Sequence, residues 1–246
     1  MEKERITELP EITDKRGTLS FAETGQHIPF RISQISCITT EQEQEPDEAM
    51  YIALSGSFKI IANDKGYILD KPYTALYMPD SIHRAATNFS AGAICLIISS
   101  DAIGGNKEKD SIQKEYIVQD CNLIKLADDG ISTCLTENIP FDIKRVFYIY
   151  NIPPAEERGM HAHKFCHEVL IAVRGSFDVE LDDGRNKRTF TLNNPVYGLH
   201  IPPGIWAVEK KYTRDAICLV LASDRYDAEN YINSHREFIK YRRNEN

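Results

Sequence analysis

The chain has 246 residues and a formal net charge of −8 at pH 7, a length that fits one large or two small domains. The acidic balance argues against a surface for nucleic acids or anionic membranes, and no apolar run approaches the ~20 residues that span a bilayer. The first 17 residues are rich in charged side chains and contain no apolar run, so we expect no secretory leader. The six cysteines form neither a CxxC pair nor a dense framework, and we therefore expect a cytoplasmic protein.

Short apolar segments, broken by glycine or Asp-Gly turns, follow one another along the chain. They are rich in β-branched residues, which is typical of strands. Closely spaced strands without intervening helices favour a sandwich or a small barrel. The clearest segments cover residues 51–66, 145–154, 169–184 and 216–224.

One helix is predicted, at residues 224–243 near the C-terminal end. Ser223 or Asp224 is available as its N-cap. The positions that recur there at helical spacing are Tyr231, His235, Phe238 and Ile239.

The chain contains an internal repeat whose matching segments keep their order and nearly their spacing. The matched pairs are 28–38 with 139–149, 55–66 with 174–184, 77–85 with 200–208, and 93–101 with 216–224. Two related domains, 1–105 and 116–246, are therefore predicted, joined by the polar linker 104–115. The expected fold is all-β: two tandem double-stranded β-helix (jelly-roll) barrels followed by the C-terminal helix.

The segment "RGMHAHKFCHEVLIAVRGSF", residues 158–177, carries the densest chemistry. His161 and His163 are two residues apart, so on a strand both side chains face the same way. Together with Glu168 they form H-x-H-x4-E-x6-G, which resembles the first motif of the metal-binding cupins. The fourth ligand of those proteins would follow Trp206, where this chain has Ala207. Two histidines and a carboxylate can still form a facial triad, so a metal site stays open.

Histidines on a polar barrel strand can also face solvent or make internal hydrogen bonds without any catalytic role. The first copy argues against that interpretation, because its corresponding stretch, residues 39–48, contains no histidine or arginine. If the imidazoles stabilised the barrel, the first copy would need a replacement for them. The cluster therefore indicates a function resident in the second copy.

The second copy closely resembles the sugar 3,4-ketoisomerases, which are WxcM-like cupins. The resemblance covers nearly all of 120–243 and is carried by "RGMHAHK", "GSFDVELDDG", "GLHIPPGIW" and "LVLASDRYDAENYI". It implies an isomerase that needs no metal or other cofactor. The substrate would be a dTDP-4-keto-6-deoxyhexose, whose keto group moves from carbon 4 to carbon 3 on the way to deoxyamino sugars of surface polysaccharides.

The resemblance extends to "DKRGTLSFAE", residues 14–23, which matches the N-terminal strand of the family. The second copy has lost Arg-Gly from its own version, residues 127–137. Family members are similar to dimers of single cupins that exchange this strand. We therefore expect a pseudo-dimer fused within one chain, in which the strand bearing Arg16 and Gly17 completes the second barrel. Whether two such chains also form a homodimer stays open.

Resemblance also implies roles for the site residues. His161 is the expected base, with His163 shuttling or orienting, since an imidazole can accept and donate protons near neutral pH. Tyr148 and Arg158 would stabilise the enediolate oxygen or fix the sugar.

The remaining candidates are assigned to substrate binding. Arg145 and Lys164 could meet the pyrophosphate or be ordinary surface charges. Trp206 could form a pocket wall or belong to the core. Glu168, where an amide is common in the family, could raise the pKa of a nearby histidine.

Two other functions remain open from the sequence. One is a metal-dependent cupin enzyme that uses His161, His163 and Glu168. The other is a non-catalytic protein that binds a sugar nucleotide. Neither the galacto or gluco configuration of the product nor the identity of the nucleotide follows from the sequence.

Overall fold

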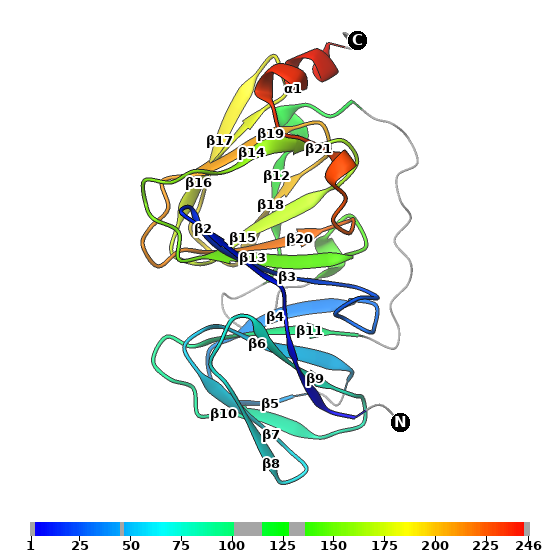
Figure 1. Ribbon diagram of the computed structural model, residues 1–246, viewed down its shortest axis with the longest axis vertical. Coiled ribbons are helices and arrows are strands. Elements are labelled where there is room, and N and C mark those ends of the chain that lie inside the picture. The colour runs from blue at the N-terminus through cyan, green and yellow to red at the C-terminus, as the bar shows by residue number, and fades with distance from the viewer. Residues whose placement is uncertain (1–2, 45–46, 101–114, 128–135, 244–246) are drawn as a thin grey trace.

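The computed structural model describes residues 3–44, 47–100, 115–127 and 136–243. Two antiparallel β structures are stacked along the long axis of the molecule, with the N-terminal half at one end and the C-terminal half at the other (Figure 1). Each half consists of two sheets, as predicted for an all-β chain with a C-terminal helix. Within the described residues, no helix is long and apolar enough to cross a membrane.

The first half has a five-stranded sheet, β1-β9-β6-β11-β4, and a four-stranded sheet, β5-β10-β7-β8. These strands are β1 (Arg5–Glu8), β4 (Gln34–Ile38), β5 (Gln42–Gln44), β6 (Ala49–Ser55), β7 (Phe58–Ala62), β8 (Lys65–Leu69), β9 (Thr74–Met78), β10 (Arg84–Thr87) and β11 (Ile94–Ser99).

The second half has a seven-stranded sheet, β12-β18-β15-β20-β13-β3-β2, and a five-stranded sheet, β17-β16-β19-β14-β21. These strands are β2 (Glu11–Asp14), β3 (Gly17–Glu23), β12 (Asn122–Lys125), β13 (Arg145–Tyr150), β14 (Arg158–His163), β15 (Glu168–Arg174), β16 (Phe177–Asp182), β17 (Lys187–Leu192), β18 (Tyr197–Ile201), β19 (Trp206–Lys210), β20 (Ile217–Ala222) and β21 (Tyr231–Ile232).

The N-terminal segment contributes to both halves. Strand β1 pairs with β9 of the first half. In the next hairpin, β2–β3, strand β3 pairs with β13 of the second half from Thr18 to Glu23. The hairpin that carries Arg16 and Gly17 therefore lies in the sheet of the second barrel, where the strand-exchange hypothesis puts it. Most of the corresponding stretch of the second copy, residues 127–137, lies outside the described residues, as do 104–114 of the predicted linker.

A shared apolar core lies between the five-stranded sheet of the first half and the seven-stranded sheet of the second. It includes Phe30, Tyr77, Tyr148 and Tyr150, whose rings stack in two pairs. Apolar burial stabilises by roughly 25 cal/mol for each Å² removed from water. Since side chains of both halves share this core, the fold of each half is coupled to its contact with the other.

The predicted helix at 224–243 is wrong over its first half. Helix α1 spans only His235–Arg242, with Ser234 as its N-cap, and residues 228–230 form a single 3₁₀ turn. Tyr231 and Ile232 form β21, which pairs with β14 through Tyr231 and His163. Tertiary pairing overrides the helical periodicity here, because the backbone of this segment satisfies its hydrogen bonds along the edge of β14.

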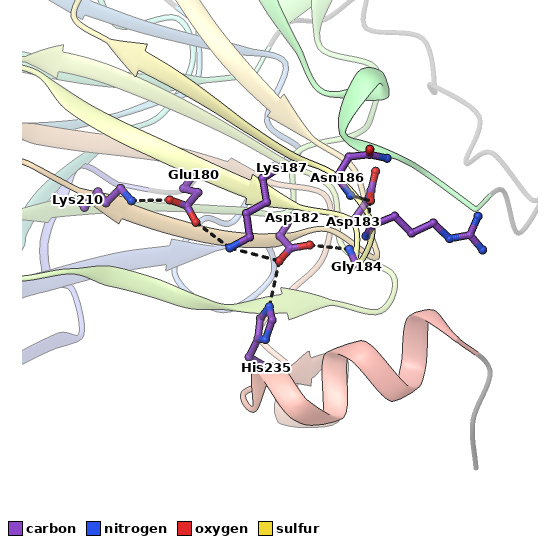
Figure 2. Close-up of polar contacts among 9 residues, drawn as sticks. Glu180, Asp182, Asp183, Gly184, Asn186, Lys187, Lys210 and His235 are labelled. Atoms are coloured by element: carbon purple, nitrogen blue, oxygen red, sulfur yellow. Dashed lines mark hydrogen bonds and ion pairs between the residues drawn. The ribbon is translucent and has the colours of Figure 1, made fainter.

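Helix α1 docks on the turn between β16 and β17, as Figure 2 shows. Nε2 of His235 lies 3.0 Å from Oδ2 of Asp182, and Nζ of Lys187 lies 3.6 Å from that same oxygen. The side chain of Arg242 donates to the carbonyl oxygens of Asp183 and Tyr116. The helix is thus fixed to the outer face of the second barrel.

Candidate active site

A β-bulge in β14 sets the direction of the candidate catalytic side chains. Gly159 and Met160 both have positive φ, 70° and 55°, and the register with β19 shifts at this point. Arg158 lies opposite Glu209, and His161 lies opposite Ala207. Residues directly opposite each other in an antiparallel pair share a face, so the extra residue places Arg158 and His161 on the same side although they are three apart.

Gly159 is required at the bulge for two reasons. Its positive φ favours glycine, and a Cβ at this position would lie 2.8 Å from the carbonyl oxygen of Ala207. The same Cβ would lie 3.2 Å from Oε1 of Glu209. The absence of a side chain therefore lets β14 and β19 approach each other beside the histidines.

The histidines and Glu168 converge on one point inside the second barrel. Nε2 of His161 and Nε2 of His163 are 3.2 Å apart, and Nε2 of His163 is 3.2 Å from Oε1 of Glu168. Behind the carboxylate, Nη2 of the buried Arg145 lies 3.8 Å from the same oxygen. The ring of Tyr231 covers both imidazoles, with centroid distances of 4.9 Å to His161 and 4.3 Å to His163.

Burial and neighbouring charges set the protonation of this cluster. Burial is the main cause that lowers the pKa of His161, and the adjacent His163 lowers it further. Glu168 acts to raise the pKa of His161, as expected, but the effect of burial is larger and the pKa is lowered. For Glu168, burial alone would raise the pKa, but His163, His161 and Arg145 outweigh it and lower that pKa to about 2. At neutral pH the site holds a carboxylate and a neutral His161.

Asp14 connects Arg158 to the hairpin contributed by the N-terminal segment. Its Oδ1 lies 3.5 Å from Nη1 of Arg158, and its Oδ2 accepts a 2.6 Å hydrogen bond from Arg16. Gly17 follows with φ 114°, and a Cβ there would lie 2.9 Å from the carbonyl oxygen of Tyr150. The turn of the hairpin thus brings Asp14, Arg16 and Gly17 to the end of the strand that carries the histidines.

Arg145 and Lys164 differ from each other in position. The exposed fraction of Arg145 is 4%, and its guanidinium lies 5.0 Å from the ring centroid of Phe147, so it is no surface charge. Lys164 is at the surface and donates a 2.7 Å hydrogen bond to the carbonyl of Glu229. Lys164 therefore fixes the 3₁₀ turn that precedes Tyr231.

The structure places two predicted site residues elsewhere. The hydroxyl of Tyr148 donates to the carbonyl of Pro72, across the core between the two halves. Because side chains alternate along β13, Arg145 and Phe147 face the interior of the second barrel and Tyr148 faces the other side. Trp206 lies opposite Ala162, on the other face from the histidines, and packs against His235 and Phe238 under α1. Neither Tyr148 nor Trp206 contacts the cluster.

Two residues of the site escaped the sequence analysis. Tyr231 was placed on a helix, although it lies in the "YDAENYI" string that carries part of the resemblance. Asp14 stands two residues before Arg16, and its hydrogen bond to the Arg16 backbone is typical of a turn. That short spacing is the signal that could have found it.

The first half fills the corresponding space with an arginine. In the internal repeat Arg84 aligns with Ala207, and Arg84 is buried. Its guanidinium donates to the hydroxyl of Tyr51 at 2.8 Å and to the carbonyls of Pro79 and Asp47. In the described part of the chain, the histidine–carboxylate cluster of the second half is the one group with metal-ligand spacing.

A cleft of about 950 Å³ adjoins this site at the seam between the halves. Phe165 and Tyr226, both 62% exposed, line it together with three basic residues, Arg31, Lys144 and Arg225. Tyr226 connects the cleft to the cluster, because its ring lies 5.4 Å from that of Tyr231. Its backbone N–H also donates to Glu23 of β3 at 2.6 Å.

One family model matches both halves of the chain. The family model described as WxcM-like, C-terminal (FdtA) matches residues 2–118 and again 118–243. The TDP-4-oxo-6-deoxy-alpha-D-glucose-3,4-oxoisomerase of Aneurinibacillus thermoaerophilus is 44% identical over 123 residues, which is 49% of this chain and 88% of that protein.

Two solved structures each match about half of the chain. QdtA, a sugar 3,4-ketoisomerase from Thermoanaerobacterium thermosaccharolyticum in complex with TDP, is 34% identical with a TM-score of 0.50. The match covers 52% of this chain and 98% of that one. A 3,4-ketoisomerase from Helicobacter canadensis is 38% identical, with a TM-score of 0.48 over 50% of this chain and 98% of that one.

Proposed function

Because the chain belongs to the WxcM-like, C-terminal (FdtA) family in both of its halves, we propose that it is a sugar-nucleotide 3,4-ketoisomerase. It would move the keto group of a dTDP-4-keto-6-deoxyhexose from carbon 4 to carbon 3 in the cytoplasm, on a route to deoxyamino sugars. The names of the relatives support the substrate class. The observation that carries the proposal is the convergence of His161, His163 and Glu168 inside one barrel.

The chemistry follows from the protonation of the cluster. The ketone at carbon 4 acidifies the hydrogen on carbon 3, and the neutral His161 accepts that proton. Its lowered pKa keeps the imidazole unprotonated, hence available as a base, at neutral pH. His163, paired with the ionised Glu168, orients His161 through the 3.2 Å contact. Arg158 stabilises the enediolate oxygen as a charge-assisted donor.

The cleft beside the cluster is the proposed place of the nucleotide. Exposed aromatic rings such as Phe165 and Tyr226 stack on a base, and basic side chains bind a pyrophosphate. Two of the basic residues are already oriented by carboxylates: Arg31 by Asp142 at 2.8 Å and Lys144 by Asp224 at 3.6 Å. The sugar would then extend past Tyr231 to the histidines.

The two domains divide the work within this proposal. Residues 116–246 carry the histidines, and residues 1–105 supply the hairpin with Asp14, Arg16 and Gly17. The pairing of β3 with β13 supports this division, as does the ion pair between Asp14 and Arg158. One chain would thus contain the equivalent of a dimer with a single working site.

A metal-dependent cupin reaction is the second candidate. One observation favours it: the ligand atoms of His161, His163 and Glu168 lie within 4.8 Å of one another, a spacing that suits a facial triad. A metal held there would supply Lewis-acid chemistry to a bound substrate. Stoichiometric iron or manganese in the purified protein, with activity lost to a chelator, would establish this candidate over the first.

The test of the proposed function is incubation with dTDP-4-keto-6-deoxyglucose, followed by NMR of the sugar ring. The expected product is the 3-keto isomer, and the coupling constants at carbon 4 report its galacto or gluco configuration. A His161→Asn variant should leave the substrate unchanged. If the wild-type protein binds the substrate without converting it, the chain is a sugar-nucleotide binding protein instead.

A further inference from the structure

A buried carboxyl group lies in the second barrel and takes no part in the chemistry described so far. Glu209 belongs to β19, is 7% exposed, and lies opposite Arg158 of β14 on one side and Val179 of β16 on the other. Two residues earlier on the same face, Ala207 lies opposite His161. Glu209 is therefore the titratable side chain that β19 directs to the same interior as His161.

The contacts of Glu209 leave one of its two carboxyl oxygens free of the Tyr212 hydrogen bond and directed toward the bulge of β14. The Tyr212 hydroxyl donates a 2.8 Å hydrogen bond to Oε2, which leaves Oε1 above the bulge at Gly159, two residues before His161. Arg158, which lies opposite Glu209, makes its ion pair with Asp14.

Other titratable groups face Glu209 from the neighbouring strands: Glu168 on β15 and Cys218 on β20. Burial raises the pKa of Glu209 to about 7, against the hydrogen bond from Tyr212 and the charge of Arg158, which lower it. A pKa this close to neutral lets both the protonated and the ionised form of this carboxyl group be populated at neutral pH. That is the condition under which a group donates and recovers a proton efficiently.

We propose that Glu209 is the second acid–base group of the site and delivers the proton that carbon 4 receives. This inference rests on the proposed isomerase function. The C–H bond at carbon 3 breaks and its proton goes to His161, while the electron pair forms the carbon 3–carbon 4 double bond of the enediol. The O–H bond of Glu209 then breaks as a C–H bond forms at carbon 4.

The proton balance closes without a further reactant. Oxygen 3 releases its hydroxyl proton and becomes the ketone, and oxygen 4 takes up one proton and becomes the hydroxyl. His161 returns its proton to solvent, and the Glu209 carboxylate regains one from solvent. The net reaction is an isomerisation, with no oxidant or reductant.

The experiment separates the two half-reactions in deuterated water. Glu209→Gln should keep the exchange of deuterium into carbon 3, which needs only His161, and lose conversion to the 3-keto product by about 10²-fold. Glu180→Gln, on the outer face of β16, is the matched control and should show both rates of the wild type. If Glu209→Gln converts substrate at the wild-type rate, or loses both rates while keeping its melting temperature, the proposal is wrong.

Failure of the proposed function would look different, because the wild-type protein itself would then show neither exchange nor conversion. Where Glu209→Gln does not fold, Tyr212→Phe replaces it. Removing that hydroxyl takes away a hydrogen bond that lowers the pKa of Glu209. The pH at which conversion falls, near 7 in the wild type, should move upward while exchange at carbon 3 persists. An unmoved midpoint would overturn the assignment.

Discussion

At His161, burial and a second imidazole act in the same direction, and both lower the pKa of the ring. At Glu168 they oppose each other, and the histidines together with Arg145 prevail over burial. One barrel interior thus holds a neutral base and an ionised carboxylate side by side. The neighbours of each residue thus set its protonation state.

Replacing the base should remove most of the activity. We expect His161→Asn to lower kcat for the isomerisation by about 10² to 10⁴-fold, because a positioned base contributes that range. The variant should still bind TDP, since the proposed nucleotide cleft lies beyond Tyr231. Steady-state kinetics and a TDP titration are the measurements. Retention of more than a tenth of kcat would show that His161 is not the base.

Glu209 should leave a signature in stability as well as in catalysis. Its pKa of about 7 in the folded protein lies above the ordinary 4.5, so the folded state keeps a proton that the unfolded chain loses. The contribution of Glu209 to the free energy of unfolding should therefore fall as the pH rises from 4.5 to 7, by up to about 3 kcal/mol.

Glu209→Gln should flatten this dependence in urea denaturation between pH 5 and pH 8. Glu180→Gln serves again as the control, since Glu180 lies on the outer face in ion pairs with Lys187 and Lys210. An identical pH dependence in wild type and Glu209→Gln would mean that Glu209 ionises normally in the folded protein.

At the scale of elements, the sequence predicted least well which side chains of a strand face the barrel interior. The i, i+2 rule correctly placed His161 and His163 on one face. It could not place Arg158 beside them, because that needs the extra residue at Gly159–Met160, which only the pairing with β19 reveals. It also could not choose between Phe147 and Tyr148, which depends on which face of β13 meets the other half.

The C-terminal segment shows the same limit in another form. Its helical periodicity correctly predicted α1 but extended it over Tyr231, which pairs with β14 instead. A local pattern does not report an unsatisfied strand edge contributed by residues far away in the chain. The hydrogen bonds available at that edge decided the structure of the segment.

The hairpin β2–β3 should control activity through Asp14. In Asp14→Asn the ion pair with Arg158 is lost, and we expect kcat/KM to fall by about tenfold. The melting temperature should change little because Asp14 is exposed. Asp178→Asn, which removes a surface ion pair with Lys211, is the control and should be neutral. Unchanged kinetics in Asp14→Asn would separate the hairpin from the chemistry.

For the whole molecule, the internal repeat correctly predicted two all-β halves, because matching segments of one sequence fold in matching ways. The absence of histidines from the corresponding stretch of the first copy is the reason why the sequence predicts the active site in the second copy. The burial of Arg84 in the first half was not foreseen, since no pattern in residues 77–85 shows that its guanidinium would be satisfied by carbonyl groups.

The two halves should remain together when the chain is cut between them. With a protease site inserted in 104–115, we expect the cleaved protein to elute as one species and keep its activity, because β3 pairs with β13 and a common core joins the halves. Residues 116–246 expressed alone should lack activity. Size-exclusion chromatography and the isomerase assay measure both outcomes. Full activity in residues 116–246 alone would show that the N-terminal hairpin is dispensable.

The central claim is that the histidine cluster of the second barrel starts the isomerisation by removing the proton from carbon 3, without help from a metal ion. Its most direct test is NMR of dTDP-4-keto-6-deoxyglucose in deuterated water, with wild-type protein that has been exhaustively treated with a chelator. The account predicts the 3-keto isomer, labelled with deuterium at carbon 4, at the rate seen before treatment. Conversion that stops on chelation and returns with added iron or manganese would contradict it.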